Sequence, residues 1–136
     1  MNNARRQFFQ FAVIGGIGFA IDGGLLTLLS ILWGMNVYVA RLVSFLTATL
    51  STWWLNRKHT FGMAPSGEFR AHANEYTRYF FIQVGGGLIN LAVFVWLVYL
   101  EPRFRALPIL PLACGASIAL LWNFFGARLL VYRNRG

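Results

Sequence analysis

The sequence predicts an all-α membrane protein with four transmembrane helices. Only 12% of its 136 residues are charged and 57% are hydrophobic, whereas soluble domains carry about 25% charged residues. Four apolar stretches reach the roughly 20 residues that a helix needs to cross a bilayer. The second half of the chain also resembles the first, which predicts two parallel two-helix repeats within a single domain of residues 1–136.

The first predicted span covers residues 8–33 and contains one ionisable residue, Asp22. An Arg5-Arg6 pair precedes the apolar run, as it does in signal peptides. The run is too long for the apolar region of a signal peptide, and further spans follow it. We therefore expect an uncleaved first helix.

The other predicted spans cover residues 37–56, 79–100 and 107–130. A short turn at residues 34–36 separates the first two spans. Arg41 lies near the start of the second span and weakens the prediction that this stretch crosses the membrane.

The distribution of basic residues predicts that both termini are cytoplasmic. The polar segment 57–78 and the two chain ends carry most of the arginines, and the opposite side carries three. Positive residues collect on the cytoplasmic side of membrane proteins. The segment 57–78 is therefore predicted to be a cytoplasmic loop, in which residues 68–77 form either a short surface helix or a solvated linker.

The net charge of +8 is compatible with two classes of binding partner, nucleic acid and anionic lipid. Basic proteins often bind nucleic acid, but here the arginines flank apolar runs instead of forming a patch on a soluble face. The expected partners are therefore anionic lipid head groups in the membrane, and no nucleic acid.

The repeat is predicted at one constant separation of 71 residues, without gaps. Each half ends with an aromatic pair, an arginine three residues after that pair and another aromatic four residues later. Parallel repeats are related by an axis along the membrane normal, with a site at their interface. The matching positions are Phe9 and Phe80, Gly15 and Gly86, Ala48 and Ala119, Trp53-Trp54 and Phe124-Phe125, Arg57 and Arg128, and Phe61 and Tyr132.

Small and polar residues recur at helical spacing in every span. Such faces let helices approach closely and hydrogen-bond to one another. The predicted faces are Gly15, Gly18 and Asp22; Arg41, Ser44, Ala48, Ser51 and Thr52; Gln83, Gly87 and Asn90; and Gly115, Ala119, Asn123 and Gly126.

The polar residues on these faces are candidates for a functional interior. A carboxylate at the bilayer centre costs about 2.5–3.5 kcal/mol on insertion scales, so Asp22 needs a partner. That partner is either a neighbouring helix or a ligand rich in hydroxyls, such as a sugar. The candidate sugar-binding residues are Asp22, Gln83, Asn90, Asn123 and, at the cytoplasmic end, Asn56.

Basic and aromatic residues at the cytoplasmic ends form a second candidate site. Arg57, Lys58 and Arg128 are predicted to bind a lipid phosphate, since the planar guanidinium forms paired hydrogen bonds with phosphate. They also fit the alternative of ordinary positive-inside anchors. Trp53 and Trp54 fit either an interfacial aromatic belt or stacking on a sugar ring.

The sequence contains no pattern that predicts catalysis, a metal or a cofactor. His59 and His72 have no cysteine or carboxylate partners at metal-ligand spacing. No nucleophile–base motif is present, and the glycine run 85–87 lies inside a span. We therefore expect no enzymatic activity.

The chain resembles the GtrA-like family of small four-span bacterial membrane proteins over almost its whole length. A tryptophan is common between the Asn-Arg and the Phe of the family's second-span motif, and here His59 stands in that place. The motifs that carry the resemblance are Phe8-Phe9 through Val13-Ile14-Gly15-Gly16 to Asp22; Asn56-Arg57-Lys58-His59-Thr60-Phe61; Phe80-Phe81 to Gly86 and Asn90; and Asn123-Phe124-Phe125 with Arg128 and Tyr132.

This resemblance implies a flippase that moves a polyprenyl-phosphate-linked monosaccharide across the bacterial cytoplasmic membrane for cell-surface glycosylation. It implies a polyprenyl-phosphate glycosyltransferase as partner and no catalytic residues. A non-transporting scaffold for that enzyme and a small proton-coupled exporter, with Asp22 as its proton site, are the alternatives. A homodimer is plausible because four short spans enclose little volume.

Overall fold

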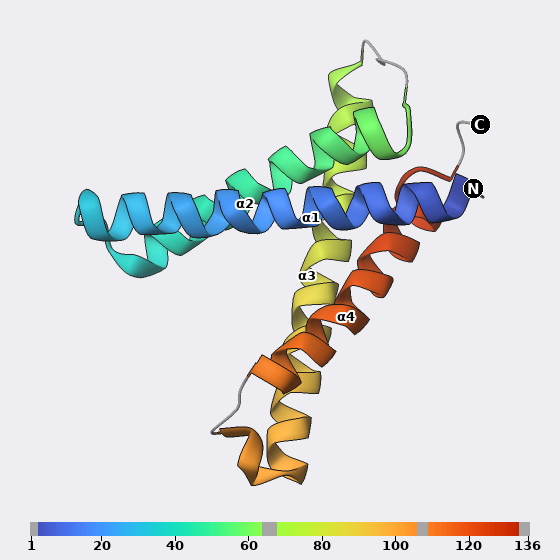
Figure 1. Cartoon of the computed structure of the whole chain (residues 1–136). Coiled ribbons are helices and arrows are strands. Elements are labelled where there is room, and N and C mark those ends of the chain that lie inside the picture. The colour runs from blue at the N-terminus through green and yellow to red at the C-terminus, as the bar shows by residue number, and fades with distance from the viewer. Residues whose placement is uncertain (1–2, 64–67, 106–108, 134–136) are drawn as a thin grey trace. The chain divides into compact units, whose positions relative to one another are not determined.

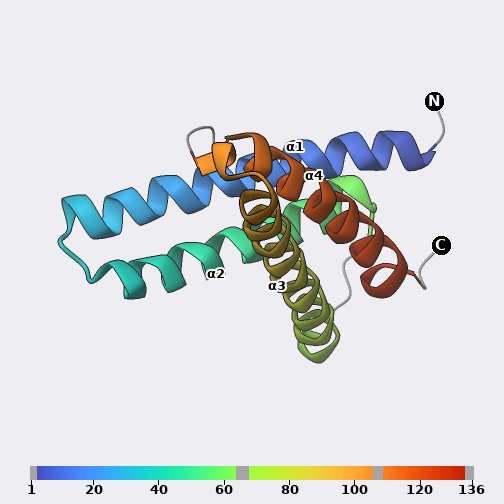
Figure 2. The ribbon, with the colours of Figure 1, turned by 90° about the horizontal axis from the view of Figure 1, so that it is seen from below.

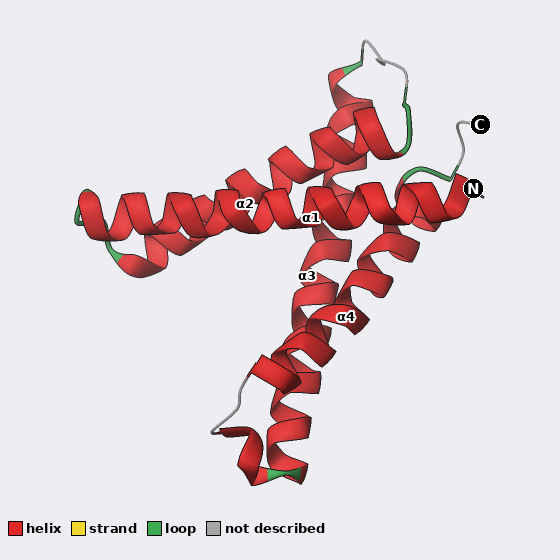
Figure 3. Cartoon of the chain, viewed as in Figure 1, coloured by secondary structure: helices red, strands yellow, loops and turns green. Residues whose placement is uncertain are grey.

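The structure is a computed structural model that describes residues 3–63, 68–105 and 109–133. Every regular element among these residues is helical, which confirms the all-α prediction (Figure 3). Helix α1 (Asn3–Thr27) continues as the π-helical segment η1 (Leu28–Leu32), and α2 (Val37–Leu55) continues as the π-helical segment η2 (Asn56–Thr60).

The second half of the chain repeats this order of elements. Helix α3 (Phe69–Leu100) is followed by a 3-10 turn, η3 (Pro102–Arg105). Helix α4 (Ile109–Gly126) then continues as a third π-helical segment, η4 (Ala127–Val131).

The chain divides into two compact units, Met1–Glu68 and Phe69–Gly136. Within the first unit α2 folds back along α1, and within the second α4 folds back along α3 (Figures 1 and 2). Each unit is therefore an antiparallel helical hairpin, and each is described by itself.

Among the residues that the structure describes, three helical stretches are long and apolar enough to cross a membrane: Asn3–Leu32, Phe69–Leu100 and Leu110–Val131. They overlap the first, third and fourth predicted spans; residues 107–108 of the fourth span lie outside the described residues. The second predicted span forms a helix, α2, where it was expected. This helix is not apolar enough to be counted among the candidate membrane spans. Its composition explains this, because α2 carries Arg41 and five serine or threonine residues between positions 44 and 52.

The polar segment 57–78 is mostly helical. Residues 57–60 belong to η2, and residues 69–78 are the first turns of α3. A solvated linker over 68–77 is therefore wrong, and the helix there is continuous with the third span instead of lying separately.

Local chemistry sets the helix ends in the first unit. The Oδ1 atom of Asn36 accepts hydrogen bonds from the backbone N–H groups of Tyr38 (3.0 Å) and Val39 (3.4 Å), which caps α2. Gly34 and Gly62 have φ values of 66° and 59°, the left-handed conformation that ends a helix and that glycine adopts without steric cost.

The two glycine caps have the same construction, an aromatic-Gly-Met sequence after a π-helical segment. The backbone N–H of Met35 donates to the Leu29 carbonyl, and that of Met63 donates to the Arg57 carbonyl, both at 2.9 Å. Each bond closes a wide turn that satisfies carbonyls left over at the helix end.

Buried positions correspond between the two hairpins. Buried residues of α3 lie 68 positions after their counterparts in α1, and buried residues of α4 lie 71 positions after their counterparts in α2. The gap-free separation of 71 predicted for the whole chain therefore does not hold in α1 and α3, where the packed face is shifted by one helical turn. The buried pairs are Phe11 and Tyr79, Ile14 and Ile82, and Gly18 and Gly86 at 68; and Ala40 and Pro111, Ser44 and Gly115, Ala48 and Ala119, and Trp53 and Phe124 at 71.

Glycines allow close contact between α3 and α4. A Cβ atom placed on Gly86 would overlap the Asn123 amide, and one on Gly126 would lie 2.8 Å from Ile82. At Gly115 it would overlap the Asn90 side chain and lie 2.7 Å from the Asn90 carbonyl oxygen. The predicted small-residue face of the fourth span thus lies against α3.

Two glycines were assigned to the wrong face. A Cβ atom on Gly15 or Gly87 would meet nothing within 4 Å. In α1 the close contact is made by Gly18, where a Cβ would overlap Cγ2 of Thr52. In α3 it is made by Gly85 and Gly86. A glycine run contains no signal that distinguishes the packed glycine from its neighbours.

We expect Gly115→Ala to destabilise the second hairpin by about 1–3 kcal/mol, the usual cost of overpacking. The obstructing atom is a backbone carbonyl oxygen, which cannot move aside as a side chain does. Unfolding in detergent micelles with increasing dodecyl sulfate measures the effect. Gly87→Ala is the matched control, because it meets open space and alanine favours a helix; equal stability of both variants would contradict the contact.

Candidate functional site

Asp22 lies between the helices of the first hairpin with both carboxylate oxygens occupied. Its Oδ2 atom is 2.5 Å from Nη1 of Arg41, and its Oδ1 atom accepts a hydrogen bond of 2.7 Å from the Ser44 hydroxyl. The Asp22 side chain is 16% exposed and Ser44 is fully buried. Of the two partners predicted for Asp22, the structure has the neighbouring helix.

The pairing with Arg41 was missed in the sequence, although Arg41 was placed on the polar face of the second span. Counted from the turn at 34–36, Asp22 is 12 residues away and Arg41 is five. At 1.5 Å per residue this is a difference of about 10 Å in depth, which argues against contact. The length of the arginine side chain bridges it. The sequence signal for this pair is that Arg41 is the base of the second predicted span, next along the chain to the span that carries Asp22.

Arg41 is only partly enclosed. Its side chain is 53% exposed, and its guanidinium carbon lies 6.0 Å from the centre of the Phe45 ring, within range of a cation–π contact. The charge of Asp22 is therefore balanced inside the hairpin, by a group that still reaches its surface.

Asn56 has a structural place under η2. Its Oδ1 atom accepts a hydrogen bond of 2.8 Å from the Thr60 hydroxyl, and Asn56 itself is fully buried. This bond spans four residues across the π-helical segment. Asn56 therefore stabilises the turn that carries the basic residues, and its binding of a sugar stays a prediction.

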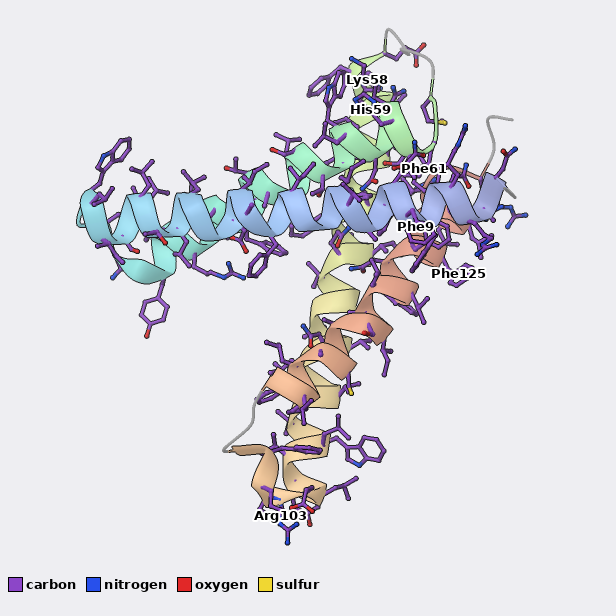
Figure 4. All side chains as sticks on the ribbon, viewed as in Figure 1. Phe9, Lys58, His59, Phe61, Arg103 and Phe125 are labelled. Atoms are coloured by element: carbon purple, nitrogen blue, oxygen red, sulfur yellow. The ribbon has the colours of Figure 1, made fainter. Side chains whose placement is uncertain are left out.

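The basic residues of η2 divide into a buried and an exposed group. Arg57 is 3% exposed, with Nη1 3.5 Å from the Met63 carbonyl oxygen. Lys58 and His59 are exposed at the end of α2 (Figure 4). Lys58 is thus accessible for a phosphate, whereas Arg57 is packed into the end of the hairpin.

Arg128 lies on η4, at the position that corresponds to Arg57 in η2, and is half-buried. Both segments end with the same π-type hydrogen bond of 3.0 Å, from Phe61 N–H to the Asn56 carbonyl and from Tyr132 N–H to the Ala127 carbonyl. Arg57 and Arg128 belong to different units, so their joint binding of one phosphate stays a prediction.

The aromatic pairs each have one core member and one outward member. Trp53 is buried and its ring centre lies 5.9 Å from that of Trp54, which is 51% exposed. Phe124 is buried 5.3 Å from Phe125, which is 50% exposed. Trp54 and Phe125 are therefore the members available to lipid or ligand, and Trp53 serves the core.

The second hairpin holds two amides whose oxygens lack a donor. The Oδ1 atoms of Asn90 on α3 and Asn123 on α4 are buried and have no hydrogen-bond partner among the described residues. Asn90 lies against Gly115, and Asn123 lies against Gly86. Gln83, the third predicted polar residue of this unit, is half-buried on α3.

These polar contacts occupy corresponding levels in the two hairpins. At each level a polar side chain of one helix meets a small or hydroxyl-bearing residue of the other. In the first unit the carboxylate is fully paired, and in the second the amide oxygens are open. The corresponding contacts are Gly18 with Thr52 and Gly86 with Asn123, then Asp22 with Ser44 and Asn90 with Gly115.

The family described as GtrA/DPMS, transmembrane domain, matches residues 10–132. The chain belongs to this family. The match spans both hairpins, including every polar contact described above, and confirms the GtrA-like resemblance of the motifs. A GtrA/DPMS transmembrane domain indicates a multi-pass membrane protein involved in handling polyprenyl-phosphate sugars.

We expect Thr60→Val to destabilise this GtrA-like chain by about 1–3 kcal/mol, because it removes the donor to a buried Asn56 oxygen. The unfolding free energy in detergent measures the loss. Thr60→Ser keeps the hydroxyl and should retain most of the stability. An equal loss in both variants would assign the effect to the methyl group instead.

Proposed function

We propose that the protein is a flippase for a polyprenyl-phosphate-linked monosaccharide in the bacterial cytoplasmic membrane. It works without covalent chemistry. The observation that carries this proposal is the pair of buried, undonated amide oxygens of Asn90 and Asn123 in a chain of this family.

A buried amide oxygen without a donor is costly, by roughly 1–3 kcal/mol in proteins. In hydrocarbon no water is present to supply the missing bond. Sugar hydroxyls are donors of the right kind, and a head group that passes along the hairpin would satisfy both oxygens in turn. A purely structural hairpin gains nothing from leaving them open.

The phosphate is proposed to bind at the cytoplasmic ends of the second helices. Lys58 is exposed there, and Arg57 and Arg128 occupy corresponding positions on η2 and η4. Charge-assisted bonds to a phosphate are strong, and guanidinium groups can make two at once. The polyprenyl tail would remain in lipid while the sugar crosses.

This function is proposed with four spans, both termini inside and the two hairpins as parallel repeats. Basic residues at both ends and in 57–78 support a cytoplasmic position for these parts. The equal burial patterns of the two hairpins support the repeat. In this topology α2 crosses the membrane, although its composition alone does not predict a membrane span.

One observation supports the alternative of a scaffold for a polyprenyl-phosphate glycosyltransferase. α3 has 32 residues, about 48 Å at 1.5 Å per residue, against a hydrocarbon thickness of about 30 Å. Its N-terminal turns therefore extend beyond the membrane as a helix, and Phe69 there is 86% exposed. No comparable observation supports a proton-coupled exporter, since both oxygens of Asp22 are already engaged.

We expect Asn90→Leu combined with Asn123→Leu to abolish flipping while the protein stays as stable as before. Leucine has the same heavy-atom branching as asparagine, although its methyl groups are bulkier, and it removes two undonated amides. The measurement is movement of a short-chain polyprenyl-phosphate hexose between leaflets of proteoliposomes, beside dodecyl sulfate unfolding. Asn74→Leu, an exposed position on the extension of α3, is the control. Full flipping by the double variant would favour the scaffold.

A second prediction concerns the phosphate. Arg128→Gln and Arg57→Gln should each weaken binding of a short-chain polyprenyl phosphate about tenfold, or about 1.4 kcal/mol. Lysine at either position should restore only part of it, since it lacks the guanidinium fork. Arg103→Gln, on the exposed turn between α3 and α4, is the control (Figure 4). Unchanged binding in folded Arg57 and Arg128 variants would reduce both residues to topology anchors.

A further inference from the structure

Apart from Ser44, which donates to Asp22, the serine and threonine hydroxyls of α2 are satisfied by their own helix. Each serine and threonine between positions 47 and 52 donates to a backbone carbonyl three or four residues earlier. In a dry medium such bonds let a polar helix keep its hydroxyls without help from a neighbour. The bonds run from Thr47 to Val43 (2.8 Å), Thr49 to Phe45 (3.0 Å), Ser51 to Thr47 (2.8 Å) and Thr52 to Thr49 (3.1 Å).

Arg41 is the remaining obstacle to insertion of α2. It is the one charged residue of that helix, and an arginine inside a membrane is among the costliest groups to insert. It also lies on the side that the positive-inside rule leaves poor in arginine. Its ion-pair partner Asp22 comes from the other helix of the same hairpin.

The geometry around Asp22 is specific to this pairing. The buried hydroxyl of Ser44 donates to Oδ1, which turns Oδ2 toward the Arg41 guanidinium. Both α2 residues contact the same carboxylate, so α1 brings one group that satisfies two polar positions of α2. Insertion of Asp22 into the membrane with α1 also costs free energy. The ion pair lowers the cost of inserting both Asp22 and Arg41.

We infer that α2 is a conditional span, which crosses the membrane only as a hairpin with α1 because Asp22 neutralises Arg41. This inference rests on the four-span topology proposed above. Without Asp22, α2 would remain on the outer side of the membrane, together with the basic residues of η2.

The test measures on which side of the membrane His59 lies. A single cysteine is placed by His59→Cys in a Cys114→Ser background, because His59 is exposed at the end of η2. Intact cells or cell-free inner-membrane vesicles are treated with a membrane-impermeant maleimide. In the parent chain we expect labelling from the cytoplasmic side only.

Asp22→Leu should raise labelling from the outer side about tenfold, since each unpaired charge in a span shifts insertion strongly. Arg41→Leu should keep the parent topology, and Asp22→Leu with Arg41→Leu should restore it. The exchange of Asp22→Arg with Arg41→Asp should also restore it, which keeps the test informative if a single variant is degraded in cells. Thr27→Leu, an exposed polar position of α1, is the control.

Two results would overturn the inference alone. One is an Asp22→Leu chain that keeps the parent topology. The other is an altered topology of the Asp22→Leu chain that is restored neither in the double variant Asp22→Leu with Arg41→Leu nor in the charge exchange. Outer labelling of the parent chain would instead refute the four-span topology, and with it the inference.

Discussion

A membrane interior supplies no water, so every polar group in this chain must find its partner in the protein, and most of the structure follows from that constraint. The backbone is helical throughout the described spans. The hydroxyls of α2 between positions 47 and 52 donate to their own helix, Asn56 accepts from Thr60, and Asp22 is held by Arg41 and Ser44. The undonated amide oxygens of Asn90 and Asn123 depart from this pattern, as does that of Gln10 on α1, and the pair in the second hairpin supports a polar ligand.

The two hairpins apply one packing scheme to different chemistry. Glycines 18 and 86 mark the same level of the first helix in each unit, and Thr52 and Asn123 face them from the second helix. One turn further, the first hairpin pairs charges where the second has an amide against Gly115. The first unit thus pairs its charges internally, whereas the second carries the two open acceptors proposed to receive a sugar.

Helix ends concentrate the groups proposed to bind phosphate. The π-helical segments η2 and η4 widen the last turn of α2 and α4, and irregular turns of this kind are frequent at functional sites. In η2 the widened turn buries Asn56 and Arg57 and exposes Lys58 and His59. The turn therefore determines which basic groups of η2 are accessible.

Composition and apolar length alone determined the helical class, the first, third and fourth spans, and the motifs of the GtrA/DPMS family, because these depend on local sequence. Packing decided the rest. Which glycine of a run faces the neighbouring helix depends on the rotation of that helix, so Gly86 could not be told from Gly87. The one-turn shift between α1 and α3 has the same cause. The pairing of Asp22 with Arg41 also needed the folded hairpin, since a long side chain crosses a depth that residue counting keeps apart.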